Sequence, residues 1–111
     1  MLKINTKQVD TIMVLSLRGR VDVTTVNELR EAVKKLSEEG YKNFVFDMGR
    51  IDFIDSIGLG ALVTCLRIAV KNDGDVKLAK LQGHVRAIVE ITRLHKLFDI
   101  FEDVESAIKA Y

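Results

Sequence analysis

Two kinds of hydrophobic periodicity alternate along the chain, and together they predict strands that alternate with helices. Short, dense or alternating apolar runs are typical of strands, and they occupy residues 2–9, 11–18, 43–48, 76–81 and 97–101. Apolar residues three and four positions apart are typical of amphipathic helices, and they occupy residues 25–40, 56–71, 83–93 and 103–110. The predicted order is therefore β-β-α-β-α-β-α-β-α.

This order predicts an α/β fold in which a mixed, largely parallel sheet of about four to five strands has flanking helices. The first two strands are separated only by Asp10 and predict an antiparallel hairpin. Thr25 and Glu28 have the spacing of a capping box at the start of the first helix. Loops that follow parallel strands share one rim of the sheet, so residues 19–22 and 51–56 should meet there.

Composition narrows the functional classes. A length of 111 residues predicts one domain, residues 1–111. Lys and Arg number 17 against 16 Asp and Glu, a formal net charge of +1, which favours neither nucleic acid nor an anionic membrane as a partner. Residues 1–5 do not show the long apolar run of a signal peptide and no apolar run is long enough to cross a bilayer, so we expect neither a leader nor a membrane-spanning helix. A single cysteine, Cys65, and the lack of metal-ligand spacing predict a cytoplasmic protein without disulfide, metal or cofactor.

Ser56 is the most informative candidate residue, because it stands between a predicted strand and the second helix. One interpretation is structural: Ser56 or Asp55 caps the helix by accepting a backbone N–H. The other is regulatory, since free N–H groups and a positive dipole end at a helix start tolerate a phosphate. A phosphate adds about −1.5 to −2 charges, so it would change what the surface binds while the fold survives.

The second helix carries two apolar stripes on nearly opposite sides. The stripe expected to face the sheet contains Leu59, Leu62, Val63, Leu66 and Val70. The other stripe starts beside Ser56 and contains Ile57, Ala61, Thr64, Cys65 and Ile68. A second apolar side is either covered by a neighbouring helix or offered to a partner. In so small a chain we expect the second stripe to be exposed to solvent.

Enzymatic alternatives find little support. The residues around Ser56 do not form the Gly-x-Ser-x-Gly elbow of a hydrolase, and His84 and His95 are predicted to be solvated and away from the rim. Gly58-Leu59-Gly60 lacks the third glycine of a dinucleotide fingerprint, and no Walker sequence occurs. Asp47 could accept a phosphate in a receiver domain, but no acidic pair follows an early strand to hold magnesium. We therefore predict a protein that is not an enzyme.

Three segments, in order, match one known pattern. Residues 19–22 resemble a Gly-x-Leu/Val-Asp element after the second strand, residues 53–60 resemble a phosphoacceptor loop, and residues 85–98 resemble a closing pattern. These segments resemble the anti-sigma factor antagonists of the sulfate transporter and anti-sigma antagonist (STAS) domain family, over nearly the whole chain. Ile57 departs from that pattern, because many members carry Ser or Thr there. Gly83-His84 likewise replaces a frequent Ser-Pro.

The resemblance implies a switch with two partners. The unmodified protein would bind an anti-sigma factor with serine kinase activity and so release a sigma factor. Phosphorylation of Ser56 would dissolve the complex, and a metal-dependent serine phosphatase would reset it. The resemblance and the second apolar stripe of the helix over residues 56–71 together predict the partner-binding residues, which are Asp22, Asp55, Ile57, Gly58, Ala61, Thr64 and Ile68. The chain would be a monomer or a weak homodimer. An alternative is a scaffold or regulatory subunit of a signalling complex or of a lipid-transport ATPase.

Overall fold

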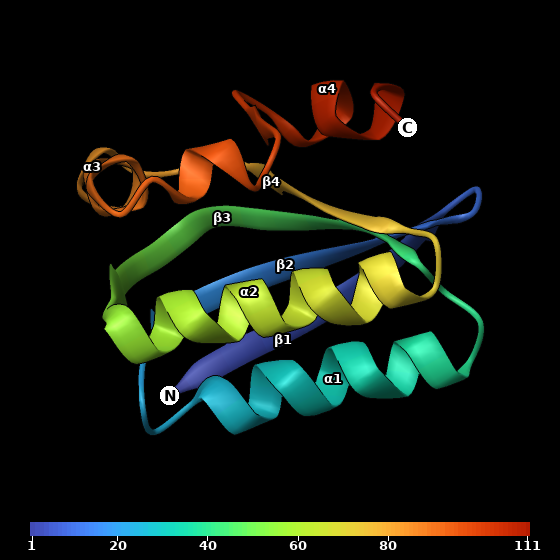
Figure 1. Cartoon of the computed structure of the whole chain (residues 1–111), viewed down its shortest axis with the longest axis horizontal. Coiled ribbons are helices and arrows are strands. Elements are labelled where there is room, and N and C mark those ends of the chain that lie inside the picture. The colour runs from blue at the N-terminus through green and yellow to red at the C-terminus, as the bar shows by residue number, and fades with distance from the viewer.

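The computed structural model describes residues 1–111 and contains the elements in the predicted order (Figure 1). The strands are β1 (Leu2–Val9), β2 (Ile12–Val21), β3 (Asn43–Ile54), β4 (Asp75–Ala79) and β5 (Ile100–Phe101). The helices are α1 (Val26–Glu38), α2 (Ser56–Lys71), α3 (Gly83–Ile91) and α4 (Val104–Lys109), with a short 3₁₀ turn, η1 (Leu94–Lys96). Helix α3 ends two residues before its predicted end at residue 93, and β5 is shorter than the predicted strand over residues 97–101.

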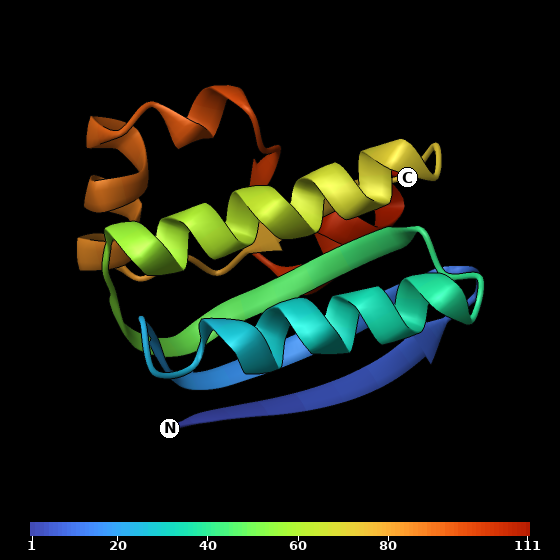
Figure 2. The same cartoon turned by 60° about the horizontal axis from the view of Figure 1, so that its bottom comes forward.

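The strands form one sheet in the order β1-β2-β3-β4-β5. The β1–β2 pair is antiparallel and every other neighbouring pair is parallel, which confirms the predicted mixed, largely parallel sheet. Helices α1 and α2 lie side by side on one face, where α3 joins the same core through Val85 and Val89, and α4 lies on the other face (Figure 1, Figure 2).

The main hydrophobic core fills the space between the sheet and the α1–α2 layer. Its largest fully buried side chains include Leu15, Phe44 and Phe46 from the sheet and Leu29 and Leu62 from the helices. A smaller core gathers on the opposite face, and its buried members are Ile12, Val14, Val45, Ala79 and Ala107. Ala107 belongs to α4, so the apolar part of that face lies under α4.

Strand β3 has 12 residues, twice the predicted length, because two β-bulges interrupt its alternation. The buried residues Met48, Ile51 and Ile54 are three positions apart rather than two. The register against β2 slips by one residue at two places in this stretch, and each bulge adds one residue to one strand of the pair. A strand that seemed to end at Met48 therefore continues to the rim.

The predicted capping box at Thr25 is wrong, although Thr25 does precede α1. The Thr25 hydroxyl donates to the Arg20 carbonyl at 2.8 Å and accepts from the Asp22 N–H at 3.0 Å. It makes no cap hydrogen bond to the first turn. The buried hydroxyl instead holds the loop between β2 and α1 in one conformation. At the other end of α1, Gly40 adopts φ +103, a left-handed conformation that is typical of the residue after a helix.

Candidate functional site

The loops after β2 and β3 meet at the rim, as predicted, and the first turn of α2 packs directly on them (Figure 1). The Asp55 N–H donates to the Val21 carbonyl at 3.4 Å. Gly58 packs against the same carbonyl so closely that a Cβ at this position would overlap the Val21 oxygen. It would also lie 2.8 Å from Ile54 Cγ1. Glycine is needed here because no side chain fits between α2 and the end of β2.

Asp55, and not Ser56, caps α2. Asp55 Oδ1 accepts from the Gly58 N–H at 2.7 Å, and the Asp55 backbone is extended, as in a helix N-cap. Ser56 is therefore the first helical residue. Its side chain is exposed and its hydroxyl has no hydrogen-bond partner in the protein. The structural interpretation of Ser56 as a cap is thus wrong, and the hydroxyl is open to chemistry from outside.

The backbone around Ser56 suits an added anion. The N–H groups of Ser56 and Ile57 lie in the first turn of α2 and find no acceptor within the protein. They stand at the positive end of a helix of 16 residues. A phosphate on Ser56 could accept hydrogen bonds from these groups without disturbing the Asp55 cap.

Asp22 lies next to this turn and is itself almost fully buried. Its Oδ1 accepts from the Thr24 hydroxyl at 2.6 Å and the Thr24 N–H at 2.9 Å, and its Oδ2 accepts from Arg20 Nε at 3.2 Å. The Thr24 hydroxyl, more than the nearby guanidinium, holds the pKa of Asp22 below its ordinary value. Asp22 is therefore an ionised residue that shapes the β2–α1 loop, with little surface left to touch a partner.

Exposed apolar side chains surround the Ser56 end of α2. Val23 is 62% exposed, Ile57 47% and Phe53 37%. The Arg20 guanidinium lies 4.1 Å from the centroid of the Phe53 ring, a cation–π contact. Apolar and arginine side chains of this kind are enriched in protein interfaces. Val23 and Phe53 were not predicted as surface residues, because Val23 lies in the turn after β2 and Phe53 in the bulged end of β3, where no regular period shows which side chains are exposed.

The expected division of α2 into an inner and an outer stripe is confirmed only in part, since Leu59 of the inner stripe is buried and Ile57 of the outer stripe is exposed. Ala61 and Cys65 are buried, although they belong to the stripe that was expected to be exposed, and Gly58, a predicted partner-binding residue, is buried as well. Helix α1 covers this flank (Figure 2), and the charge of Arg30 on α1 reaches the Cys65 thiol. Gly58 and Ala61 therefore offer no side chain to a partner.

The other flank of α2 is more open than expected. Val70 is exposed and Val63 and Leu66 are half-buried. They line a groove of about 410 Å³ together with Arg67, Lys71 and Leu97. The outward face of α2 thus begins at Ser56, passes Gly60 and Arg67, and has apolar margins on both sides, with half-buried Thr64 and Ile68 on the α1 side.

The histidines do not form a catalytic pair with Ser56. His84 lies nearer the rim than expected, because α3 begins beside β3, and its Nε2 is 2.8 Å from the Asp52 carbonyl oxygen. His95 lies in the exposed η1 turn. Neither ring makes a hydrogen bond to Ser56. No group of three or more metal-ligating side chains is present in the structure, and none of its helices has the length and apolar character required to span a bilayer.

Comparisons with known proteins agree with this geometry. The chain is 28% identical over 104 residues to an anti-sigma-B factor antagonist of Staphylococcus aureus, covering 94% of this chain and 96% of the relative. It is 26% identical over 110 residues to an anti-sigma factor antagonist of Bordetella bronchiseptica, covering 99% and 95%. Anti-sigma factor antagonists are regulatory proteins and not enzymes.

Solved structures share the fold. A crystal structure of an anti-sigma factor antagonist homologue from Thermotoga maritima superposes with a TM-score of 0.91 at 19% identity, covering 96% of this chain and 92% of that one. The unphosphorylated form of SpoIIAA, an anti-sigma factor antagonist, gives 0.84 at 21% identity, covering 97% and 95%. The model of the STAS domain matches residues 3–107. On this match the chain belongs to the STAS domain family, and the relatives that it resembles over nearly their whole length are anti-sigma factor antagonists.

Proposed function

We propose that this protein is a partner switch: unmodified, it binds an anti-sigma factor that is also a serine kinase, and phosphorylation of Ser56 ends that binding. The observation that carries the proposal is the state of Ser56, an exposed and unbonded hydroxyl at the first position of α2. Two relatives are named as anti-sigma factor antagonists. SpoIIAA, whose fold this chain shares, is known in a phosphorylated form, with a TM-score of 0.76.

The binding surface is the Ser56 end of the rim and the outward face of α2. Asp55 and Ile57 flank the hydroxyl, and Thr64 and Ile68 continue the same side of the helix. Asp22 contributes by fixing the adjacent loop. Exposed Val23 and Phe53 extend the surface beyond α2.

The chemical step belongs to the kinase. The γ-phosphoryl group of ATP passes to Ser56 Oγ, the hydroxyl proton leaves to a base of the kinase, and ADP is the leaving group. The new phosphate stands on the residue next to Asp55, whose carboxylate caps the same helix. Burying this charge against a partner that fitted the neutral hydroxyl costs several kcal/mol. Each 1.4 kcal/mol changes the affinity tenfold, which is sufficient for a switch.

The fold is expected to survive phosphorylation, because Asp55 retains the cap and the helix start favours an anion. A metal-dependent serine phosphatase would return the protein to its binding state. The proposed setting is the cytoplasm, with no nucleic acid or membrane as a partner and with a monomer or weak homodimer as the acting form.

Incubation with the cognate kinase and ATP, followed by phosphopeptide mapping, tests the proposal. One phosphate on Ser56 is expected, and none on Ser56→Ala. Ser106→Ala is the matched control, since Ser106 is an exposed serine in the first turn of α4 behind the capping residue Asp103. Phosphate on another residue, or full modification of Ser56→Ala, would contradict the proposal. Co-purification with a transporter ATPase and no kinase would instead favour the regulatory-subunit alternative.

A further inference from the structure

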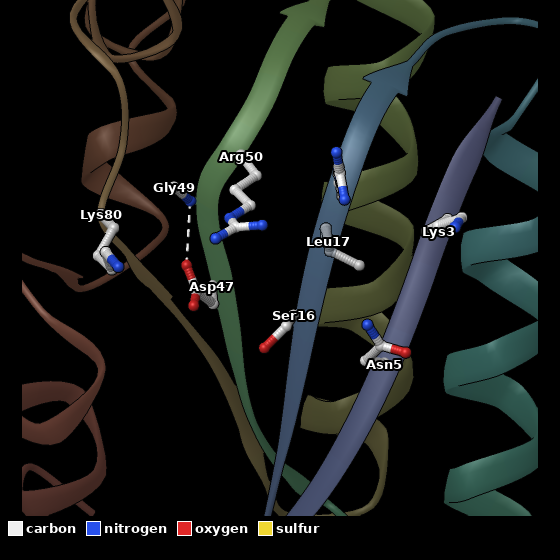
Figure 3. Close-up of a pocket in the computed structure, with 9 residues that line it drawn as sticks. Lys3, Asn5, Ser16, Leu17, Asp47, Gly49, Arg50 and Lys80 are labelled. Carbon is white, nitrogen blue, oxygen red and sulfur yellow. Dashed lines mark hydrogen bonds between the residues drawn. The ribbon is translucent and has the colours of Figure 1, made fainter.

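A second polar site lies on the sheet face opposite α1 and α2, away from Ser56. Helix α4 covers the apolar half of this face, and the other half forms an open hollow of about 540 Å³. We call it the basic hollow. Its polar lining side chains are Lys3, Asn5, Ser16, Arg18, Asp47, Arg50 and Lys80. Figure 3 shows Arg50 projecting from β3, with Asp47 and Lys80 on one side and Asn5 and Lys3 on the other.

The charge of the basic hollow is strongly unbalanced. Four cations, Lys3, Arg18, Arg50 and Lys80, face a single carboxylate, Asp47, which gives a net charge of 4 − 1 = +3. The whole chain carries only +1. None of the four cations forms an ion pair. Concentrated, unpaired positive charge in a concave site attracts anions.

The register of the sheet brings the cations together. Lys3 pairs with Arg18, and Arg18 pairs with Arg50, so the three stand in one row across β1, β2 and β3. Neighbouring strands are about 4.8 Å apart, so this row spans about 10 Å. A row of this length exceeds one phosphate group and suits two or three in succession.

A β-bulge places Arg50 in that row. Met48 and Ile51 point into the main core, and the residue added between them turns Arg50 to the open face, where regular alternation would have buried it. The Gly49 N–H donates to Asp47 Oδ1 at 3.0 Å, and Gln82 Nε2 donates to the Gly49 carbonyl at 2.5 Å. The position of Arg50 is therefore set by a specific, hydrogen-bonded backbone feature.

Lys80 is held at the edge of the basic hollow by an unfavourable backbone. Its φ of +62 lies in the left-handed region, which costs a residue with a side chain about 1 kcal/mol. Its N–H donates to the Phe101 carbonyl at 3.0 Å. A strained residue that the surroundings hold in place is a feature of ligand sites. Here the Lys80 side chain runs past Gly49, with its Cε 3.1 Å from an ideal Cβ at that position.

We propose that the basic hollow binds a chain of two or three linked phosphates. Arginine pairs bidentately with phosphate oxygens, and Ser16 and Asn5 add neutral donors. Leu17 is the one hydrophobic residue of the lining and no aromatic ring faces the hollow, so nothing is present to stack on a nucleotide base. A protein partner would need an apolar centre that the hollow lacks. This proposal does not depend on Ser56.

Calorimetric titration of the full chain with sodium tripolyphosphate at low ionic strength tests the proposal. Saturable binding is expected, and at least tenfold weaker binding for Arg18→Gln/Arg50→Gln. Lys34→Gln/Lys35→Gln removes the same charge from the exposed side of α1 and should bind like the unmodified chain. Amide resonances of Ser16 and Gly49 should shift on binding. Absence of saturation, or equal weakening in both double variants, would overturn the proposal.

Nucleotides distinguish the source of the phosphate chain. ATP should bind as tightly as tripolyphosphate, because both carry three linked phosphates that can lie along the row of cations. Adenosine monophosphate should bind at least tenfold more weakly, because its single phosphate contacts only part of that row. Ser56→Ala should leave all three affinities unchanged. Equal affinity for adenosine monophosphate and ATP would assign binding to the base and would contradict a phosphate site.

Discussion

Two glycines of α2, two residues apart, should respond to alanine with opposite signs. Gly58 is buried, and an added Cβ would overlap the Val21 carbonyl and approach Ile54 Cγ1 to 2.8 Å. Gly60 is exposed, and an added Cβ would meet nothing within 4 Å. Both residues are helical, so alanine improves helix propensity at each by about 1 kcal/mol. The difference between the two variants therefore isolates the contact with Val21.

The expected magnitudes follow from that contact. Overpacking costs about 1–3 kcal/mol, and at Gly58 the upper end applies because the obstacle is backbone and not a flexible side-chain tip. Gly58→Ala should thus lower the free energy of unfolding by about 2 kcal/mol after the propensity gain. Gly60→Ala should raise it by about 0.5–1 kcal/mol. The two variants should differ by about 3 kcal/mol.

Urea unfolding of both variants, followed by circular dichroism, measures these values. Gly58→Ala should also weaken binding to the anti-sigma factor under conditions in which it remains folded, because the shift moves Ser56 relative to the β2 loop. Gly60→Ala should unfold at a higher urea concentration than the unmodified chain. A Gly58→Ala variant as stable as Gly60→Ala would show that α2 does not pack on Val21 as described.

The remaining predictions concern the same region. Asp55→Ala should lower the free energy of unfolding by about 1 kcal/mol through loss of the cap, whereas Ser56→Ala should change it by less than about 0.5 kcal/mol in the same urea assay. Asp22 has a folded-state pKa below its unfolded value, so its ionised form stabilises the protein above about pH 4. That stabilisation is lost as the pH falls through the folded pKa. Thermal melts against pH should therefore show Asp22→Asn less stable at pH 7, with the difference vanishing in acid. Burial raises the pKa of Cys65 to about 12, so its thiol should react with a disulfide reagent at pH 8 only after unfolding.

Much of the fold could be predicted from periodicity alone. The hairpin, the central strand and α2 appear where the apolar spacing places them, because each presents one buried face. The continuation of β3 could not be predicted from a period of two, since bulges change the spacing of its buried residues to three. Apolar residues at positions 48, 51 and 54 were the available signal for a bulged strand.

The prediction of which sides of α2 are buried failed in part, and for a different reason. A helix that packs on a sheet and on a neighbouring helix buries an arc between the two contacts, and the sequence of α2 alone does not show where α1 lies. The small residues Ala61, Cys65 and Ala69, four positions apart and all buried, were the signal that a second helix approaches closely on this flank. The basic hollow was missed because its cations come from separate strands and meet only through the sheet register.

The central claim is that one phosphate on Ser56 changes partner affinity and leaves the fold intact. The most direct measurement is the dissociation constant for the anti-sigma factor, by calorimetry, of the unmodified chain and of the chain phosphorylated at Ser56. Circular dichroism of both forms checks the fold. The account predicts at least a hundredfold weaker binding after phosphorylation, with unchanged spectra. Equal affinities, or a loss of binding that accompanies unfolding, would contradict it.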